Sequence, residues 1–299
     1  MRVPRSRRRG RWLRAWLAAT AVAAVALPLA GSAVPASPGR TGGVGADDRR
    51  VLGLAEQLLT RECMRRAGFE LWVVPPAPAD QLRSFPYVVD DVAWARAHGF
   101  GTDLVAATDE RRRADPNQRY FAALPAERRV AALAALNGAR PEGLEARVPS
   151  GGVVRRSADG CTSEAQRQLY GDLPAWYRTS KVVANLSYLR QRRVLADPAW
   201  TAALRSWSRC VRQQGYPVDT PDQLREAVVT RGRAAEVAAA VTEARCAAGG
   251  LAATARELDA RHRADLTAAY RREVATRERL EQAAVPRARA VVAAESARR

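Results

Sequence analysis

The feature that most constrains the fold is a short motif that occurs twice and holds two of the chain's four cysteines. Residues 62–70 read ECMRRAGFE and residues 209–217 read RCVRQQGYP, so both copies follow the pattern Cys-x-Arg-x-x-Gly-[Phe/Tyr]. An amphipathic segment precedes each copy. Gly68 and Gly215 suit the left-handed residue that ends a helix, and the aromatic residue that follows can pack back on the last turn. Each copy therefore predicts a helix with a buried cysteine near its end.

The N-terminus has the order of a secretory signal peptide. Residues 1–16 are cationic without any acid, residues 17–33 form an apolar run rich in alanine, and small residues follow. We expect residues 1–36 to be the signal peptide and residues 37–48 to be a flexible leader. The alternative is an uncleaved anchor, but the apolar run is short for a membrane span and contains Pro28 and Gly31. The sequence has no cysteine near the cleavage site, so it does not indicate a lipid anchor.

All four cysteines, Cys63, Cys161, Cys210 and Cys246, lie after the signal peptide. An even number of cysteines in an exported chain predicts disulfide bonds. Four cysteines allow three pairings, and the simplest of them joins each motif cysteine to the next cysteine along the chain. We therefore expect Cys63–Cys161 and Cys210–Cys246.

The other uses of cysteine have little support. A zinc site needs closely spaced cysteines or histidine partners, and the spacings here are 98, 49 and 36 residues. His98 and His262 are the two histidines of the sequence, and neither lies near a cysteine. The sequence offers no Cys–His pair that would indicate a catalytic thiol with its base. We expect no metal and no cofactor.

The hydrophobic periodicity predicts a mostly α fold of two helical units, residues 49–172 and 173–285, each with one disulfide. A small β-hairpin is expected near 144–156, around a Pro-Ser-Gly-Gly turn. The principal expected helices are 49–67, 125–136, 174–194, one capped by Asp197, one with a Thr220–Gln223 capping box, 233–248, and 251–284. Pro286 is expected to end the last helix and leave residues 286–299 as a frayed tail.

A few residues suggest a site, and each has a structural alternative. Asp90 and Asp91 form a carboxylate pair, but they also fit the start of a short helix as caps. The aromatic residues Trp72, Tyr87 and Trp94 can line a groove for sugar or peptide, although such residues more often belong to a core. His262 falls on an apolar helix stripe and reads as a packed histidine.

The charge of the chain is strongly positive. The formal net charge is +18; without residues 1–36, which contain seven arginines and no acid, 42 basic and 31 acidic residues remain, a net charge of +11. Lys181 is the single lysine of the sequence, and nearly all other basic residues are arginines. Codon bias therefore explains the high arginine content as well as selection for contacts with phosphate groups does. The charge allows an anionic cell-wall polymer or an envelope protein as partner, without indicating a specific nucleic acid. Membrane attachment is expected only through an uncleaved signal.

Six separated stretches carry a family resemblance: ECMRRAGF, DDVAWARAHGFG, NQRYFAALP, GCTSEAQRQLYGD, WSRCVRQQGY and EARCAAGGL. In this order they resemble an uncharacterised group of exported proteins from high-GC Gram-positive bacteria, many of them lipid-anchored. The resemblance covers roughly residues 50–255 and implies export and paired cysteines, without an assigned activity. The chain departs from the lipid-anchored members because it lacks the acylated cysteine.

The sequence contains no Gly-rich phosphate loop, no Gly-x-Ser-x-Gly elbow and no His-Glu-x-x-His motif. This favours a secreted or cell-envelope protein that binds a partner without catalysis. The alternative is a secreted hydrolase that uses two carboxylates. Two carboxylates facing each other across a cleft would favour the enzyme.

Overall fold

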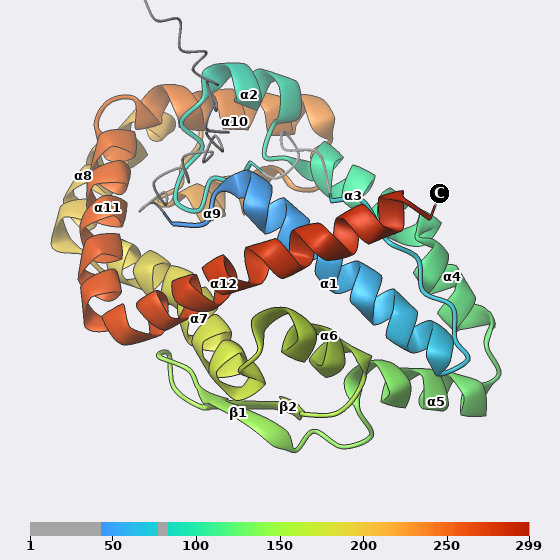
Figure 1. Ribbon diagram of the computed structural model, residues 1–299. Coiled ribbons are helices and arrows are strands. Elements are labelled where there is room, and N and C mark those ends of the chain that lie inside the picture. The colour runs from blue at the N-terminus through green and yellow to red at the C-terminus, as the bar shows by residue number, and fades with distance from the viewer. Residues whose placement is uncertain (1–42, 77–82, 299) are drawn as a thin grey trace, which may run out of the picture. The chain divides into compact units, whose positions relative to one another are not determined.

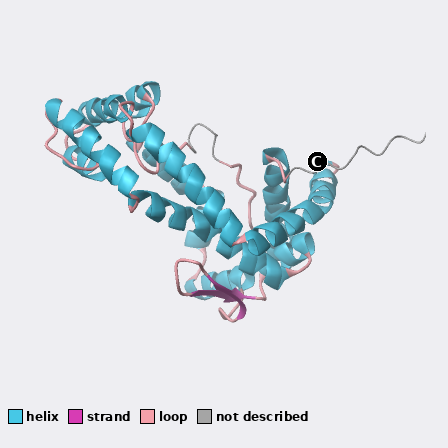
Figure 2. Ribbon diagram, turned by 90° about the vertical axis from the view of Figure 1, so that its left-hand side faces the viewer, coloured by secondary structure: helices cyan, strands magenta, loops and turns pink. Residues whose placement is uncertain are grey.

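The computed structural model describes residues 43–76 and 83–298, and this part of the chain is mostly helical, as the sequence predicts (Figures 1 and 2). The helices are α1 (Ala46–Arg66), α2 (Val92–His98), α3 (Thr102–Ala114), α4 (Pro116–Ala123), α5 (Ala126–Asn137), α6 (Cys161–Tyr170), α7 (Leu173–Leu195), α8 (Pro198–Gln213), α9 (Pro221–Val228), α10 (Arg233–Ala247), α11 (Leu251–Ala269) and α12 (Arg271–Ser296). The strands β1 (Gly143–Arg147) and β2 (Val153–Ser157) pair antiparallel, with Gly143 opposite Ser157, which confirms the hairpin. Residues 1–36, predicted to form a signal peptide, and most of the predicted leader lie outside the described residues.

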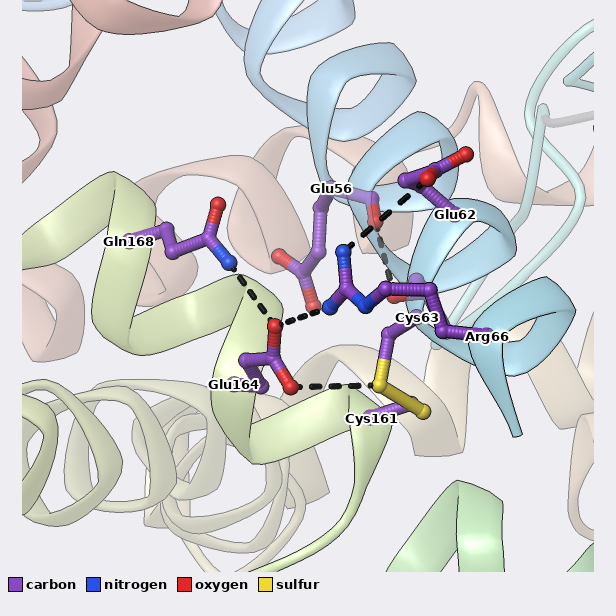
Figure 3. The surroundings of a disulfide bond; sticks show 8 residues. Glu56, Glu62, Cys63, Arg66, Cys161, Glu164 and Gln168 are labelled. Atoms are coloured by element: carbon purple, nitrogen blue, oxygen red, sulfur yellow. Dashed lines mark hydrogen bonds and ion pairs between the residues drawn. A yellow bond between two sulfur atoms is a disulfide. The ribbon is translucent and has the colours of Figure 1, made fainter.

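The first copy of the motif ends α1 and crosslinks it to α6. Gly68 has φ +79°, and the Phe69 N–H donates to the Met64 carbonyl at 3.0 Å, as in a Schellman cap. Phe69 is buried beside the Cys63–Cys161 disulfide, whose Cα atoms are 5.4 Å apart. Figure 3 shows this crosslink, with Glu164 of α6 accepting hydrogen bonds from Arg66 and Gln168.

The second copy repeats this geometry at the end of α8. Gly215 has φ +88°, and the Tyr216 N–H donates to the Val211 carbonyl at 3.0 Å. The Cys210–Cys246 disulfide joins α8 to α10, with Cα atoms 5.7 Å apart. Both expected pairings are thus confirmed. The motif occurs twice because two helix ends use the same glycine cap and the same crosslink.

The two capping glycines can be tested without steric complication. A Cβ added at Gly68 or Gly215 would meet nothing within 4 Å, so alanine there changes only the backbone conformation. We expect Gly68→Ala and Gly215→Ala each to lower the free energy of unfolding by about 1 kcal/mol, because the left-handed conformation is unfavourable for alanine. Gly53→Ala is the matched control: it has the same open space inside α1, and should raise the stability by roughly 0.5–1 kcal/mol. Urea denaturation measures all three, and a neutral Gly68→Ala would contradict the cap.

Contacts within the described residues cross the boundary predicted at residue 172. One core cluster joins α1, β1, α6, α7 and α12, and includes Leu52, Leu169 and Ala284. Another joins α8, α9, α10 and α11 around Trp207, and also contains Val88 from the loop before α2. The first and last parts of the chain therefore share a core, and the region around α2 packs on the second half.

The C-terminal part differs from the prediction of one helix ending at Pro286 and a frayed tail. The helix breaks at Tyr270 (φ −110°, ψ 28°), and α12 then continues through Pro286 to Ser296. Proline inside a helix costs about 3 kcal/mol. Ala284 and Ala288, on either side of the proline, are both fully buried, and this packing offsets the cost.

Side-chain hydrogen bonds and ion pairs also hold α12 in place. Arg287 donates to the Leu169 carbonyl at 2.7 Å, and the pairs Arg289–Asp48 and Arg61–Glu295 are both 2.7 Å long. Figure 1 shows α12 lying across α1. The residues expected to fray are therefore a packed helix in the structure.

Two local expectations also need correction. Helix α1 begins at Ala46, inside the predicted leader, because Asp47 and Asp48 in its first turn favour a helix N-terminus. Pro125 is the N-cap of α5 rather than a residue of its first turn. Helix α6 begins at Cys161 without a side-chain cap, because the Ser163 hydroxyl donates to the Ser157 carbonyl instead.

Two disulfides in one chain indicate maturation in an oxidising, extracellular type of compartment. Among the residues that the structure describes, no helix combines the length and apolarity needed to cross a membrane.

Candidate functional site

A groove of about 1160 Å³ follows one side of α11. One wall is the loop before α2, residues 83–90, called here the wall segment. Alanines of α11, from Ala252 to Ala268, and Thr267 line the groove along the helix. Lining residues on α11 run from Ala252 to Ala268, about 24 Å at 1.5 Å per residue, and Arg271 of α12 continues the lining beyond the break at Tyr270. The groove is therefore long, and its floor is mostly apolar.

Asp259 of α11 joins the wall segment to two helices. Its carboxylate accepts from the Tyr87 hydroxyl at 2.6 Å and pairs with Arg190 of α7 at 2.7 Å and with Arg263 at 2.6 Å. Burial alone would raise the pKa of Asp259, but these hydrogen bonds and charges outweigh it and lower the pKa. Burial, followed by the hydrogen bond to Asp259, raises the pKa of Tyr87 to about 12. At neutral pH, Asp259 is therefore an anion and Tyr87 a protonated donor.

A buried glutamate anchors the wall segment from behind. Glu243 of α10 is fully buried; its Oε1 accepts from the Val89 N–H at 2.7 Å and from Arg225 at 3.1 Å. Desolvation raises the pKa of Glu243 to about 7, although the Arg225 charge opposes this shift. Asp90, which follows Val89 in the wall segment, pairs with Arg256 of α11 at 2.6 Å. The wall segment is thus fixed on both sides.

Arginines dominate the rim of the groove. Those that line it are Arg83, Arg190, Arg256, Arg263 and Arg271, against the two acids Asp90 and Asp259. Both acids already form ion pairs with arginines. Arg271 is exposed and has no ion pair within the described residues. The groove therefore presents a surplus of positive charge beside an apolar floor.

The structure separates the residues that the sequence suggested for a site. Asp91 caps α2, accepting from the Trp94 N–H at 3.0 Å, whereas Asp90 lines the groove. Of the three suggested aromatic residues, Tyr87 lines the groove, Trp94 lines a different cavity, and Trp72 packs edge-on against Tyr120. They do not form one aromatic platform.

The two histidines also lie apart from the groove. His98 pairs with Asp103 at 2.8 Å, and His262 lies 3.4 Å from Asp197, with 15% of its side chain exposed. His262 is thus packed against the N-terminus of α8, as the apolar stripe predicted. The four cysteines are all in disulfides. Within the described ranges no cluster of metal-ligating side chains is present.

Sequence reasoning missed the main residues of the groove. Asp259 and Arg263 are visible as an acid–base pair four residues apart, but this spacing also occurs on ordinary exposed helices. Nothing in the sequence shows that residues 83–90 lie beside α11, about 170 positions later. The available signal was the alternation of alanine and arginine along one face of α11.

Comparison with protein-family profiles, with curated proteins and with solved structures finds no match, so the geometry of the groove is the basis for assigning a function.

Proposed function

We propose that this chain is an exported, non-enzymatic binding protein that holds an extended anionic polymer of the cell envelope along the groove. The N-terminal signal pattern, the paired cysteines and the resemblance to exported proteins of high-GC Gram-positive bacteria support export. The oxidising compartment is consistent with both a secreted and a wall-bound form. The observation that carries the binding role is the row of arginines beside the groove.

The spacing of these arginines fits a chain of repeating negative charges. Arg256 and Arg263 are seven residues apart on α11, which is about two helical turns, or about 11 Å, and Arg271 follows at the start of α12, beyond the break at Tyr270. Arg83 of the wall segment and Arg190 of α7 also line the groove, where Arg83 pairs with Asp91 at 2.8 Å and Arg190 with Asp259 at 2.7 Å. A polymer with phosphates or carboxylates at regular intervals can contact successive guanidinium groups, whereas a single small anion can contact only one or two.

The hydrolase alternative requires two carboxylates that can exchange protons with a substrate. Asp90 is held by Arg256, and Asp259 is held by Tyr87, Arg190 and Arg263. Both carboxylates serve to position the wall segment and the arginines. The arrangement is better suited to binding than to proton transfer.

The proposal predicts that the groove arginines matter by position and not by charge alone. The exported protein, titrated calorimetrically with long-chain polyphosphate, should bind at 50 mM NaCl and bind more weakly at 300 mM. The triple variant Arg256→Gln, Arg263→Gln, Arg271→Gln should lose about tenfold or more in affinity, since each contact contributes up to about 1 kcal/mol.

A matched variant removes the same charge elsewhere. Arg178, Arg205 and Arg231 are exposed and do not line the groove. Replacing these three with glutamine should change the affinity less than twofold, and retention on isolated cell wall should follow the same order. Equal losses in the two triple variants, or no binding by the native protein, would show that the groove is not the polymer site.

A further inference from the structure

We propose that a cavity between α1 and residues 71–74, called here the indole pocket, binds a neutral saccharide. The indole pocket has a volume of about 340 Å³, within the range of small-molecule sites. None of the described residues that line it also lines the groove along α11, so the proposal is independent of polymer binding. The side chains that matter here are Glu56 and Gln57 from α1, Trp72 and Val74 from the segment after α1, and Asn117 from α4.

Hydrogen bonds to the backbone hold the aromatic wall of the indole pocket in place. The Asn117 Oδ1 atom accepts from the Trp72 N–H at 2.8 Å, and the Asn117 amide group donates to the Trp72 carbonyl at 3.0 Å. The Val74 N–H donates to Gln57 Oε1 at 2.9 Å. The Trp72 ring also packs against Tyr120, with ring centroids 5.5 Å apart and an interplanar angle of 68°. The segment that carries Trp72 is therefore fixed to α1 and α4 before a ligand binds.

Trp72 supplies an apolar surface that a sugar ring can cover. It lines the indole pocket and is 42% exposed, and Val74, which also lines the pocket, is 38% exposed. The C–H groups of a pyranose ring form a flat apolar face, and the electron-rich face of an aromatic ring attracts such C–H groups. A bound sugar ring would thus remove apolar surface of both side chains from water.

The polar groups left open at the indole pocket are hydrogen-bond donors. Gln57 uses its side-chain oxygen for Val74, and its two amide N–H groups have no acceptor among the described residues. Asn117 uses one amide N–H for the Trp72 carbonyl and keeps the second. The hydroxyl and ring oxygens of a sugar accept hydrogen bonds from such amide groups. Glu56 is not needed as a contact, because its Oε1 already accepts from Gln166 at 2.7 Å.

The charges around the indole pocket favour a neutral ligand. Among the described residues that line it, Glu56 is the ionisable one and no arginine is present, whereas five arginines line the groove. The charge of nearby Arg156, which does not line the pocket, acts against that of Glu56. Neither an anion nor a cation therefore finds a free counter-charge here. A saccharide is uncharged and combines many oxygen acceptors with apolar ring faces, so it fits both the open donors and the indole.

The test is titration of the native protein with cellobiose and with N,N′-diacetylchitobiose, two neutral disaccharides, followed in heteronuclear NMR spectra. We expect saturable shifts from at least one of them and none from sorbitol at the same concentration, because sorbitol has hydroxyl groups without a ring face. Trp72→Ala should weaken the binding about tenfold, since the stacking surface is lost. Gln57→Glu keeps the oxygen that holds Val74 and removes the amide donors, and should weaken the binding about fivefold. The same spectra show whether each variant is folded.

Matched variants separate the indole pocket from the rest of the surface. Tyr188 of α7 is similarly exposed, at 49%, and does not line the pocket, so Tyr188→Ala should bind the disaccharides like the native protein. Gln118→Glu adds the same negative charge next to Asn117, on an exposed residue that does not line the pocket, and should also leave the affinity unchanged. Binding of neither disaccharide, equal shifts with sorbitol, unchanged affinity in Trp72→Ala or Gln57→Glu, or an equal loss in a control variant would overturn the proposal.

Discussion

Replacing Cys63 and Cys161 together with alanine is expected to lower the free energy of unfolding by about 4–5 kcal/mol. The disulfide closes a loop with a sequence separation of 98, and the chain-entropy relation gives about 4.7 kcal/mol for a loop of this length, as an upper figure. The crosslink also joins the start of α6 to the end of α1, where Met64 and Phe69 lie in the same small core cluster as the two cysteines. Guanidinium denaturation under non-oxidising, non-reducing conditions measures the change.

The second disulfide provides the internal comparison. The Cys210–Cys246 loop has a sequence separation of 36, for which the same relation gives about 3.8 kcal/mol. The double alanine variant of this pair should therefore be destabilised as well, but by about 1 kcal/mol less than the first. A loss below about 1 kcal/mol for either pair would contradict the role of the crosslinks as clamps.

Native stability should fall as the pH rises from 5 to 8, because Glu243 prefers to be neutral in the folded chain. Its pKa is about 7 in the fold against an ordinary value of 4.5. The folded state therefore holds this proton more tightly than the unfolded state does. The resulting stabilisation is fully present below pH 4.5 and is lost as the pH passes 7, with an upper size of about 3 kcal/mol.

The variant Glu243→Gln isolates this contribution. A glutamine oxygen can still accept from Val89 and Arg225, but the side chain no longer titrates. The variant should match the native protein near pH 5 and exceed its stability near pH 8. Partly buried Glu56 has a pKa raised in the same direction, which leaves a residual slope of stability against pH in both proteins. A native-minus-variant difference that stays constant between pH 5 and pH 8 would show that Glu243 is not protonated in the fold.

The helical class and the helix ends could be read from the sequence because their signals are local. The spacing from Cys63 to Gly68 and from Cys210 to Gly215 predicts a helix end, and the structure places a left-handed glycine at both. Asp197 and the Thr220–Gln223 box are N-caps as expected. Each of these features is decided by residues within about one helical turn.

The remaining features depend on contacts between distant segments, which a single sequence does not show. Residues around Tyr270 contain no glycine or proline, yet the helix breaks there and α12 packs on α1. Pro286 reads locally as a stop, and the burial of Ala284 and Ala288 overrides that signal. The groove likewise depends on the Tyr87–Asp259 contact across 172 positions.

Peptide mapping of the native protein without reduction tests most directly that each motif cysteine is bonded to the next cysteine along the chain. Cleavage after arginine places each cysteine in its own peptide, namely 62–65, 157–167, 210–212 and 246–256, so every pairing has a distinct mass. The structure predicts two crosslinked species, 62–65 with 157–167 and 210–212 with 246–256. Free thiols, or a crosslink between 62–65 and either of the last two peptides, would contradict the account.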